Sequence, residues 1–129
     1  MKKAYTIQQT AECTGLSVHT LRYYEKIGLL TDVNRDGNGY RLYTEADLGW
    51  IDFLIRLRAT GMPIHEMKTF SDLRSRGEST VSERRALLEE HQKLSLERMR
   101  ELQENLKKIA EKIDIYKEME DRLKKEQFI

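Results

Sequence analysis

Residues 17–29 of this chain have the sequence SVHTLRYYEKIGL. Ser17 is a favourable helix N-cap, because its hydroxyl can accept a hydrogen bond from a backbone N–H of the first turn. Gly28 favours an end to the helix, because glycine adopts the left-handed conformation there without strain. The stretch therefore predicts a helix of about three turns, with Val18 and Leu21 on its buried side.

The opposite side of this helix carries polar and cationic side chains. They follow the spacing i, i+3, i+4 and i+7, which places them on one face. The set is His19, Arg22, Tyr23 and Lys26. Such side chains suit phosphates and the base edges of a major groove. We interpret the stretch as a DNA recognition helix, and the alternative is a solvated helix face without a ligand.

The bulk composition narrows the class of protein. A length of 129 residues predicts one small domain, or a small domain with an extension. No apolar run approaches the ~18–20 residues that span a bilayer, and the N-terminus lacks the apolar core of a signal peptide. We therefore expect a cytoplasmic protein with no membrane partner. The single cysteine excludes an internal disulfide and a multi-cysteine metal cluster within one chain.

The charge balance is weak for a nucleic-acid-binding protein, since the net charge is only +1. Residues 1–75 contain ten Lys/Arg and nine Asp/Glu, and residues 76–129 contain thirteen of each. DNA binding therefore requires that the basic residues gather on one surface. The candidates are Lys2, Lys3, Arg22, Lys26, Arg35, Arg41, Arg56 and Arg58.

A shorter helix is predicted just before the recognition helix, within residues 5–15. Thr6 and Gln9 have the spacing of a capping box, and Gly15 favours an end to the helix. Two helices joined by a short, glycine-containing turn form a helix-turn-helix arrangement.

A hairpin is predicted after the recognition helix. Residues 36–39 are Asp-Gly-Asn-Gly, which tolerate the positive φ angles of a tight turn. Two short strands around this turn would form a wing, on which Arg35 and Arg41 could hold phosphates. A plain surface hairpin is the alternative.

Two further helices are predicted in the remainder of the small domain. Thr44 and Asp47 have capping-box spacing, and the apolar stripe that follows should form the core, with Trp50 in a packing role. Pro63 should occupy the first position of the next helix, where its missing N–H costs little. Residues 58–61, between the two helices, could form a second wing.

A single long helix is predicted from about residue 80 to residue 124, because this segment lacks proline and glycine. It would be on the order of 65 Å long. Apolar residues step along it by three and four, which defines a heptad seam. The seam comprises Met99, Leu102, Leu106, Ile109, Ile113 and Tyr116. A lone helix would expose this stripe, so we expect a homodimer, and a different partner chain is the alternative.

Several segments together resemble one known family. They are TLRYYEKIGL at residues 20–29, GYRLY at residues 39–43 and LRATGM at residues 57–62. Their order and spacing, and the long helix after them, are similar to the MerR family of transcription regulators. The long-helix pattern and the few residues after it resemble the short branch of that family, which lacks a C-terminal effector-binding domain.

The resemblance implies a fold class and a mode of action. The fold would be mainly α, with a winged helix-turn-helix DNA-binding domain at residues 1–75. A coiled-coil dimerisation helix at residues 76–129 would form an antiparallel coiled-coil dimer. The homodimer would bind a pseudo-palindromic promoter site and distort the DNA to control transcription by RNA polymerase, through indirect readout of DNA shape. Relatives in the short branch suggest a stress or electrophile response.

The resemblance also implies roles for individual residues. Arg22 and Tyr23 would touch bases or phosphates, and Tyr24 would brace the helix or reach a phosphate. Arg41 and Tyr43 would hold phosphate from the wing. With the helix face and the wing arginines, the predicted DNA-contacting residues are Ser17, His19, Arg22, Tyr23, Tyr24, Lys26, Arg35, Arg41, Tyr43 and Arg58.

Metal-sensing members of the family have cysteines at and beyond the start of the long helix. Residues 77–81 are Gly-Glu-Ser-Thr-Val, and no cysteine follows. We therefore expect no metal site. Cys13, in the helix before the recognition helix, could be a thiol sensor, and its alternative role is that of a small packing residue.

Two classes of function remain at this point. The first is a DNA-binding transcription regulator. The second is a coiled-coil protein-interaction module whose helix-turn-helix docks protein, which the weak net charge favours. We expect no enzyme and no cofactor, because the sequence contains no nucleophile–base set, no phosphate-cradling glycine loop and no cluster of metal ligands.

Overall fold

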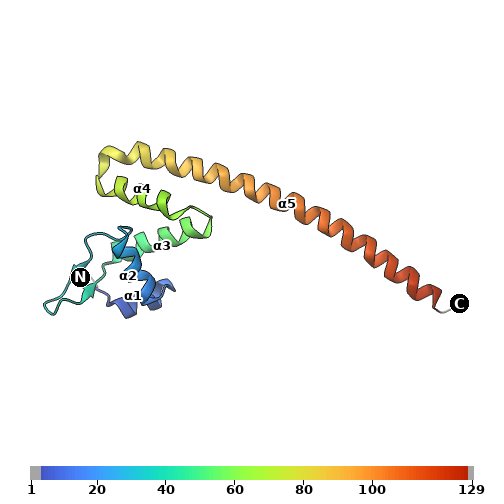
Figure 1. The fold of residues 1–129 in the computed structure, drawn as a ribbon, viewed down its shortest axis with the longest axis horizontal. Helices are drawn as coiled ribbons and strands as arrows, with labels where there is room; N and C mark the ends of the chain where they lie inside the picture. Colours follow the sequence, from blue (N-terminus) through green and yellow to red (C-terminus); the bar gives the residue numbers. More distant parts are fainter. Residues whose placement is uncertain (1–3, 128–129) are drawn as a thin grey trace. The chain divides into compact units, whose positions relative to one another are not determined.

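The computed structural model describes residues 4–127 and is mainly helical (Figure 1). The elements in chain order are α1 (Ile7–Thr14), α2 (Val18–Lys26), β1 (Asn34–Arg35), β2 (Arg41–Leu42), α3 (Glu45–Ala59), α4 (Ile64–Ser75), the 3-10 turn η1 (Glu78–Thr80) and α5 (Val81–Glu126). The chain forms two compact units, one up to residue 89 and one from residue 90 onward. The predicted mainly α fold with a small wing and a long C-terminal helix is confirmed.

Three predicted helix N-caps are confirmed. Thr6 caps α1 in a capping box with Gln9, and Thr44 caps α3 in a second box with Asp47. The Ser17 hydroxyl accepts from the backbone N–H of Thr20 at 3.0 Å and so caps α2. Each of these caps satisfies N–H groups that a helix leaves without a partner in its first turn.

Glycine ends the first two helices. Gly15 follows α1 with φ 79°, and Gly28 follows the C-cap residue of α2 with φ 87°. A side chain with a Cβ is strained at such angles, so both positions favour glycine. The turn between α1 and α2 is consequently short, as the helix-turn-helix prediction requires.

The core of the first unit gathers side chains from α2, α3, α4 and the segments between them. Its fully buried members include Leu21, Leu29, Ile51, Leu54 and Met67. Leu87 and Leu88, in the first turns of α5, also pack against this core. The apolar side of the recognition-type helix α2 therefore packs into a core that α3 and α4 help to form.

The position of Pro63 differs from the prediction by one residue. Pro63 is the N-cap of α4, with φ −64° and ψ 151°, and the helix itself begins at Ile64. The backbone carbonyl of Pro63 accepts from the N–H groups of Glu66 and Met67, both at 3.0 Å. A proline here costs no helical hydrogen bond, so the physical reason for its tolerance is the same.

Helix α5 is continuous over 46 residues, or about 70 Å. In the chain as described, the six predicted seam residues are between 48% and 57% exposed. Polar bonds fix the corner before α5, because the buried Thr80 hydroxyl donates to the Leu73 carbonyl and Arg84 donates to the Gly77 carbonyl. Among the helices of residues 4–127, none is both long enough and apolar enough to cross a membrane.

Candidate nucleic-acid interface

Helix α2 exposes the predicted cationic face. His19, Arg22, Tyr23 and Lys26 are all exposed, and the Tyr23 side chain is 44% exposed. Leu21, on the other side of the helix, is fully buried. The burial of one side leaves the polar side free to meet a ligand, as the prediction of a recognition helix requires.

Tyr24 is only 6% exposed and belongs to the core, although it was predicted either to brace the helix or to reach a phosphate. Its backbone carbonyl accepts from the N–H groups of Leu29 at 2.9 Å and Leu30 at 3.2 Å. Both observations support the bracing role. The burial is against a direct phosphate contact by the Tyr24 ring.

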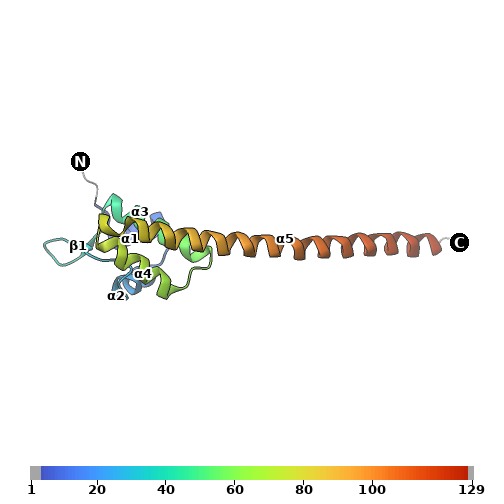
Figure 2. The ribbon, with the colours of Figure 1, turned by 90° about the horizontal axis from the view of Figure 1, so that it is seen from above.

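The wing is a two-stranded antiparallel hairpin in which Arg35 lies opposite Arg41. The Asp36 carboxylate closes its turn, because Oδ1 accepts from the backbone N–H groups of Asn38 at 2.8 Å and Tyr40 at 3.0 Å. Both views of the fold show the hairpin protruding from the helices of the first unit (Figures 1 and 2). This geometry is that of a wing beside a helix-turn-helix.

Glu25 joins the wing to the recognition helix, a contact that was not predicted from the sequence. Its Oε1 lies 3.0 Å from Nη2 of Arg35, and its Oε2 lies 2.6 Å from Nε of Arg41. Arg35 is held a second time, since its Nη1 donates to the Gly39 carbonyl at 3.1 Å. The sequence offered one signal for this contact: Glu25 is the acidic residue of a helix rich in cations, and two arginines follow in the predicted hairpin.

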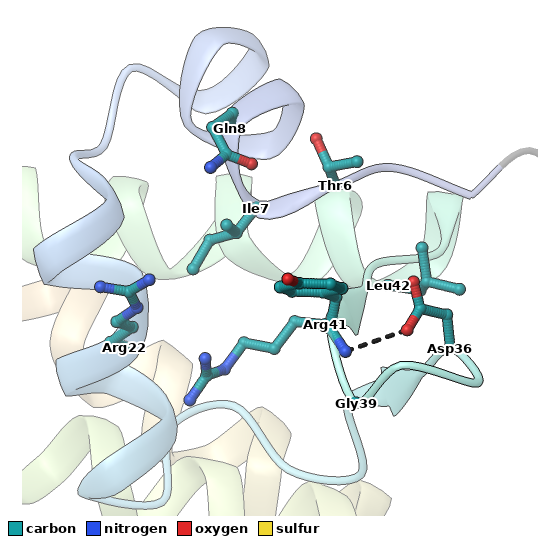
Figure 3. Close-up of a pocket in the computed structure, with 9 residues that line it drawn as sticks. Thr6, Ile7, Gln8, Arg22, Asp36, Gly39, Arg41 and Leu42 are labelled. Carbon is teal, nitrogen blue, oxygen red and sulfur yellow. Dashed lines mark hydrogen bonds between the residues drawn. The ribbon is translucent and has the colours of Figure 1, made fainter.

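A pocket of about 290 Å³ lies between the start of α1, helix α2 and the wing. Arg22 extends toward it from α2 and Arg41 from β2, while Ile7 and Gln8 border it from α1 (Figure 3). Among the described residues, no carboxylate pairs with Nη1 or Nη2 of Arg41 or with the guanidinium of Arg22. Two guanidinium groups facing one open pocket can bind an anion such as a phosphate.

Tyr43 requires a correction. It was predicted to hold phosphate from the wing, but its side chain is fully buried. Its backbone pairs with Tyr5 through two hydrogen bonds of 2.9 and 2.8 Å, which turns the ring inward. Among the residues that the structure describes, its buried hydroxyl has no hydrogen-bond partner. Burial raises the pKa of this group, with the nearby Glu25 charge as the next cause. A phosphate cannot reach Tyr43 in this conformation.

The other predicted contact residues lie outside the pocket. The Ser17 hydroxyl is engaged as the cap of α2 and also donates to Thr20 Oγ1 at 2.9 Å. Arg58 is exposed in the last turn of α3, next to the turn at Gly61.

Cys13, the candidate thiol sensor, is exposed on α1. In the part of the chain that is described, no three His, Cys, Asp or Glu side chains gather as they would to hold a metal ion.

Two family models match the chain. Residues 5–73 match the MerR HTH family regulatory protein, and residues 48–112 match the MerR, DNA binding family. An uncharacterized HTH-type transcriptional regulator from Haemophilus influenzae is 38% identical over 112 residues, which are 87% of this chain and 83% of that protein. The HTH-type transcriptional regulator AdhR of Bacillus subtilis is 39% identical over 68% of this chain and 64% of its own length.

Solved structures have the same architecture. The chain superimposes with a TM-score of 0.83 on HiNmlR, a MerR family regulator lacking the sensor domain and bound to promoter DNA. The two are 36% identical, over 90% of this chain and 92% of HiNmlR. A MerR family transcriptional regulator from Bacillus thuringiensis gives a TM-score of 0.77 at 35% identity, over 86% and 97% of the two chains.

The winged helix-turn-helix and its exposed cationic face define the class of this protein as a DNA-binding transcription regulator. The chain belongs to the MerR family. The predicted resemblance is therefore confirmed.

Proposed function

We propose that this protein binds a pseudo-palindromic promoter site as a homodimer and distorts the DNA to control transcription by RNA polymerase. The observation that carries the proposal is the juxtaposition of Arg22, on the exposed face of α2, with Arg41 of the wing around one pocket. The promoter DNA bound to the similar regulator HiNmlR supports the same role for this chain. The residues proposed to contact DNA are His19, Arg22, Tyr23, Lys26, Arg35 and Arg41. Ser17 and Arg58 lie outside the pocket and are proposed as additional contacts.

The homodimer is supported by the exposed seam on α5. Six apolar side chains at heptad positions a and d are about half exposed in the described part of the single chain, and burial of such a stripe drives coiled-coil pairing. A second copy presents the same stripe, so it can cover the first one. We propose residues 76–129 as the antiparallel dimerisation helix and residues 1–75 as the DNA-binding domain.

A dimer would place two recognition helices on two half-sites, which explains why the site should be a pseudo-palindrome. Bending and untwisting the DNA between the half-sites costs energy that depends on its sequence, so such a regulator reads shape as well as bases. We place this regulator in the cytoplasm, with no enzymatic activity of its own.

The signal that the regulator answers is proposed to be a stress or an electrophile. Exposure of Cys13 on α1 is compatible with a sensor role, because an electrophile can reach its thiol. The test is to compare promoter output of the wild type and Cys13→Ser with and without an added aldehyde. An unchanged response in Cys13→Ser would show that Cys13 is not the sensor.

The DNA-binding proposal is tested by fluorescence anisotropy at physiological salt. A labelled duplex from the promoter region beside the protein's own gene is compared with a shuffled duplex, and a gap of about a thousandfold is expected. Arg22→Ala should weaken specific binding by about 1–3 kcal/mol if Arg22 contacts a base. Arg100→Ala, an exposed arginine of α5, is the matched control and should leave binding unchanged. Equal, weak binding to both duplexes would favour the protein-docking alternative.

A further inference from the structure

The two wing arginines share one carboxylate on the recognition helix. Glu25 contacts Arg35 through Oε1 and Arg41 through Oε2, so each oxygen of the carboxylate has its own cation. The three side chains are only partly exposed, at 23% for Glu25, 45% for Arg35 and 25% for Arg41. Charge-assisted hydrogen bonds of this kind are shorter and stronger than neutral ones, and they fix geometry.

The contact between Glu25 and Arg41 Nε orients the guanidinium of Arg41 and so fixes the direction of its Nη1 and Nη2 atoms. Glu25 accepts from Nε, at the near edge of the group, and no residue within 4–127 accepts a hydrogen bond from Nη1 or Nη2. Arg41 lines the same pocket as Arg22 (Figure 3). Without the Glu25 contact, the long Arg41 side chain would sample several rotamers, and ordering it would cost entropy on binding.

We propose that Glu25 is a positioning residue for DNA binding: it fixes the wing against α2 so that Arg22 and Arg41 grip one backbone phosphate in the pocket between them. This inference rests on the proposed function, because the phosphate belongs to the bound DNA. Glu25 would therefore raise the affinity for DNA, although its negative charge by itself repels the phosphates.

These two effects of Glu25 can be separated by the direction in which Kd changes when the residue is replaced. A carboxylate next to DNA repels phosphates, so its removal should tighten binding if charge alone mattered. If Glu25 acts by holding the wing arginines, its removal should weaken binding although the protein becomes more positive. The two mechanisms therefore predict changes of Kd in opposite directions for Glu25→Gln.

The experiment measures Kd by anisotropy on the specific duplex that the wild-type chain binds, at several salt concentrations. Glu25→Gln should weaken binding by about tenfold, and the slope of log Kd against log salt should fall by about 1 because one phosphate contact is lost. Glu12→Gln, at an exposed acidic residue of α1, removes the same charge without touching the wing. It should bind as the wild type does, or slightly more tightly.

A double-mutant cycle with Arg41 separates positioning from a general structural effect. In an Arg41→Gln background, Glu25→Gln should weaken binding clearly less than it does in the wild type, because only Arg35 is then left for Glu25 to hold. Circular dichroism melts establish that the variants are folded. Arg41→Lys serves if Glu25→Gln does not fold: it keeps the charge but lacks the planar group that Glu25 holds, so it should also weaken binding.

Three results would overturn the proposal. The first is a Glu25→Gln variant that binds as tightly as the wild type or more tightly. The second is an equal loss from Glu25→Gln in the presence and in the absence of Arg41. The third is unaltered binding by Arg41→Lys. Failure of the wild-type chain to prefer the specific duplex would overturn the proposed function itself, and this inference with it.

Discussion

The indole Nε1 of Trp50 donates a hydrogen bond of 2.8 Å to the backbone carbonyl of Leu29, which lies 21 residues earlier in the chain. This bond joins α3 to the segment that leaves the recognition helix. The same ring stacks on Phe70 of α4 at 5.8 Å, and the Arg74 guanidinium lies 4.3 Å above it. Trp50 therefore holds α2, α3 and α4 together, as its predicted packing role requires.

Trp50→Phe should lower the free energy of unfolding by about 1–3 kcal/mol, because the buried Leu29 carbonyl loses its main donor. Ser71 Oγ, at 3.4 Å from the same oxygen, compensates only in part. Urea denaturation checks this, with Tyr40→Phe as the control at a highly exposed aromatic position. Equal stability of both variants and the wild type would show that the indole bond contributes nothing measurable.

Thr44→Ala should destabilise the protein by about 1 kcal/mol, because it removes the oxygen that caps α3. The control is the same substitution at Thr69, which is exposed inside α4 and whose hydroxyl donates to the His65 carbonyl of its own helix. Alanine is the better helix former there, so Thr69→Ala should leave stability unchanged or raise it slightly. In thermal melts, Thr44→Ala should thus lower the midpoint and Thr69→Ala should not.

The sequence was sufficient to predict those structural features that depend only on residues close together in the chain. The capping boxes at Thr6 and Thr44 need only the residue three positions later, and α5 needs only an uninterrupted helical segment. The helix face of Arg22 follows from the helical repeat alone. For these features, local chemistry and periodicity carry the necessary information.

The features that the sequence did not indicate depend on tertiary placement. Glu25 is separated from Arg41 by 16 residues, and the pair forms only because the hairpin folds back onto α2. The family resemblance assigned Tyr43 a phosphate contact from the wing, but its backbone pairing with Tyr5 directs the side chain to the core. Neither the return of the hairpin nor the pairing with Tyr5 has a signal in local periodicity.

Leu106→Asp should dissociate the proposed homodimer, because it places a charge in the heptad seam that pairing would bury. Sedimentation equilibrium should report a monomer at concentrations where the wild type is a dimer. Lys108→Asp introduces the same side chain two residues later, outside the seam, and should leave the dimer intact. A wild-type chain that sediments as a monomer would contradict the homodimer directly.

Tyr43→Phe should reveal the cost of the buried hydroxyl. Burial and the charge of Glu25 raise the pKa of Tyr43 above the value of about 10 that it has when unfolded. The unfolded chain therefore releases this proton first as pH rises, and the wild type loses stability from about pH 10 up to the folded pKa. Tyr43→Phe lacks this loss, so its stability relative to the wild type should increase as pH rises above 10.

At pH 7 the same variant should be as stable as the wild type or more stable by up to about 1 kcal/mol, since it removes an unsatisfied buried polar atom. Urea denaturation between pH 7 and pH 11 gives both quantities. Tyr5→Phe is the necessary comparison, because the hydrogen bond from Tyr5 to Glu45 raises the pKa of Tyr5 as well. At pH 7 Tyr5→Phe loses that bond, so only Tyr43→Phe should combine full stability at neutral pH with a shallower decline above pH 10. A Tyr43→Phe variant that is clearly less stable at pH 7 would show that the hydroxyl has a partner in solution.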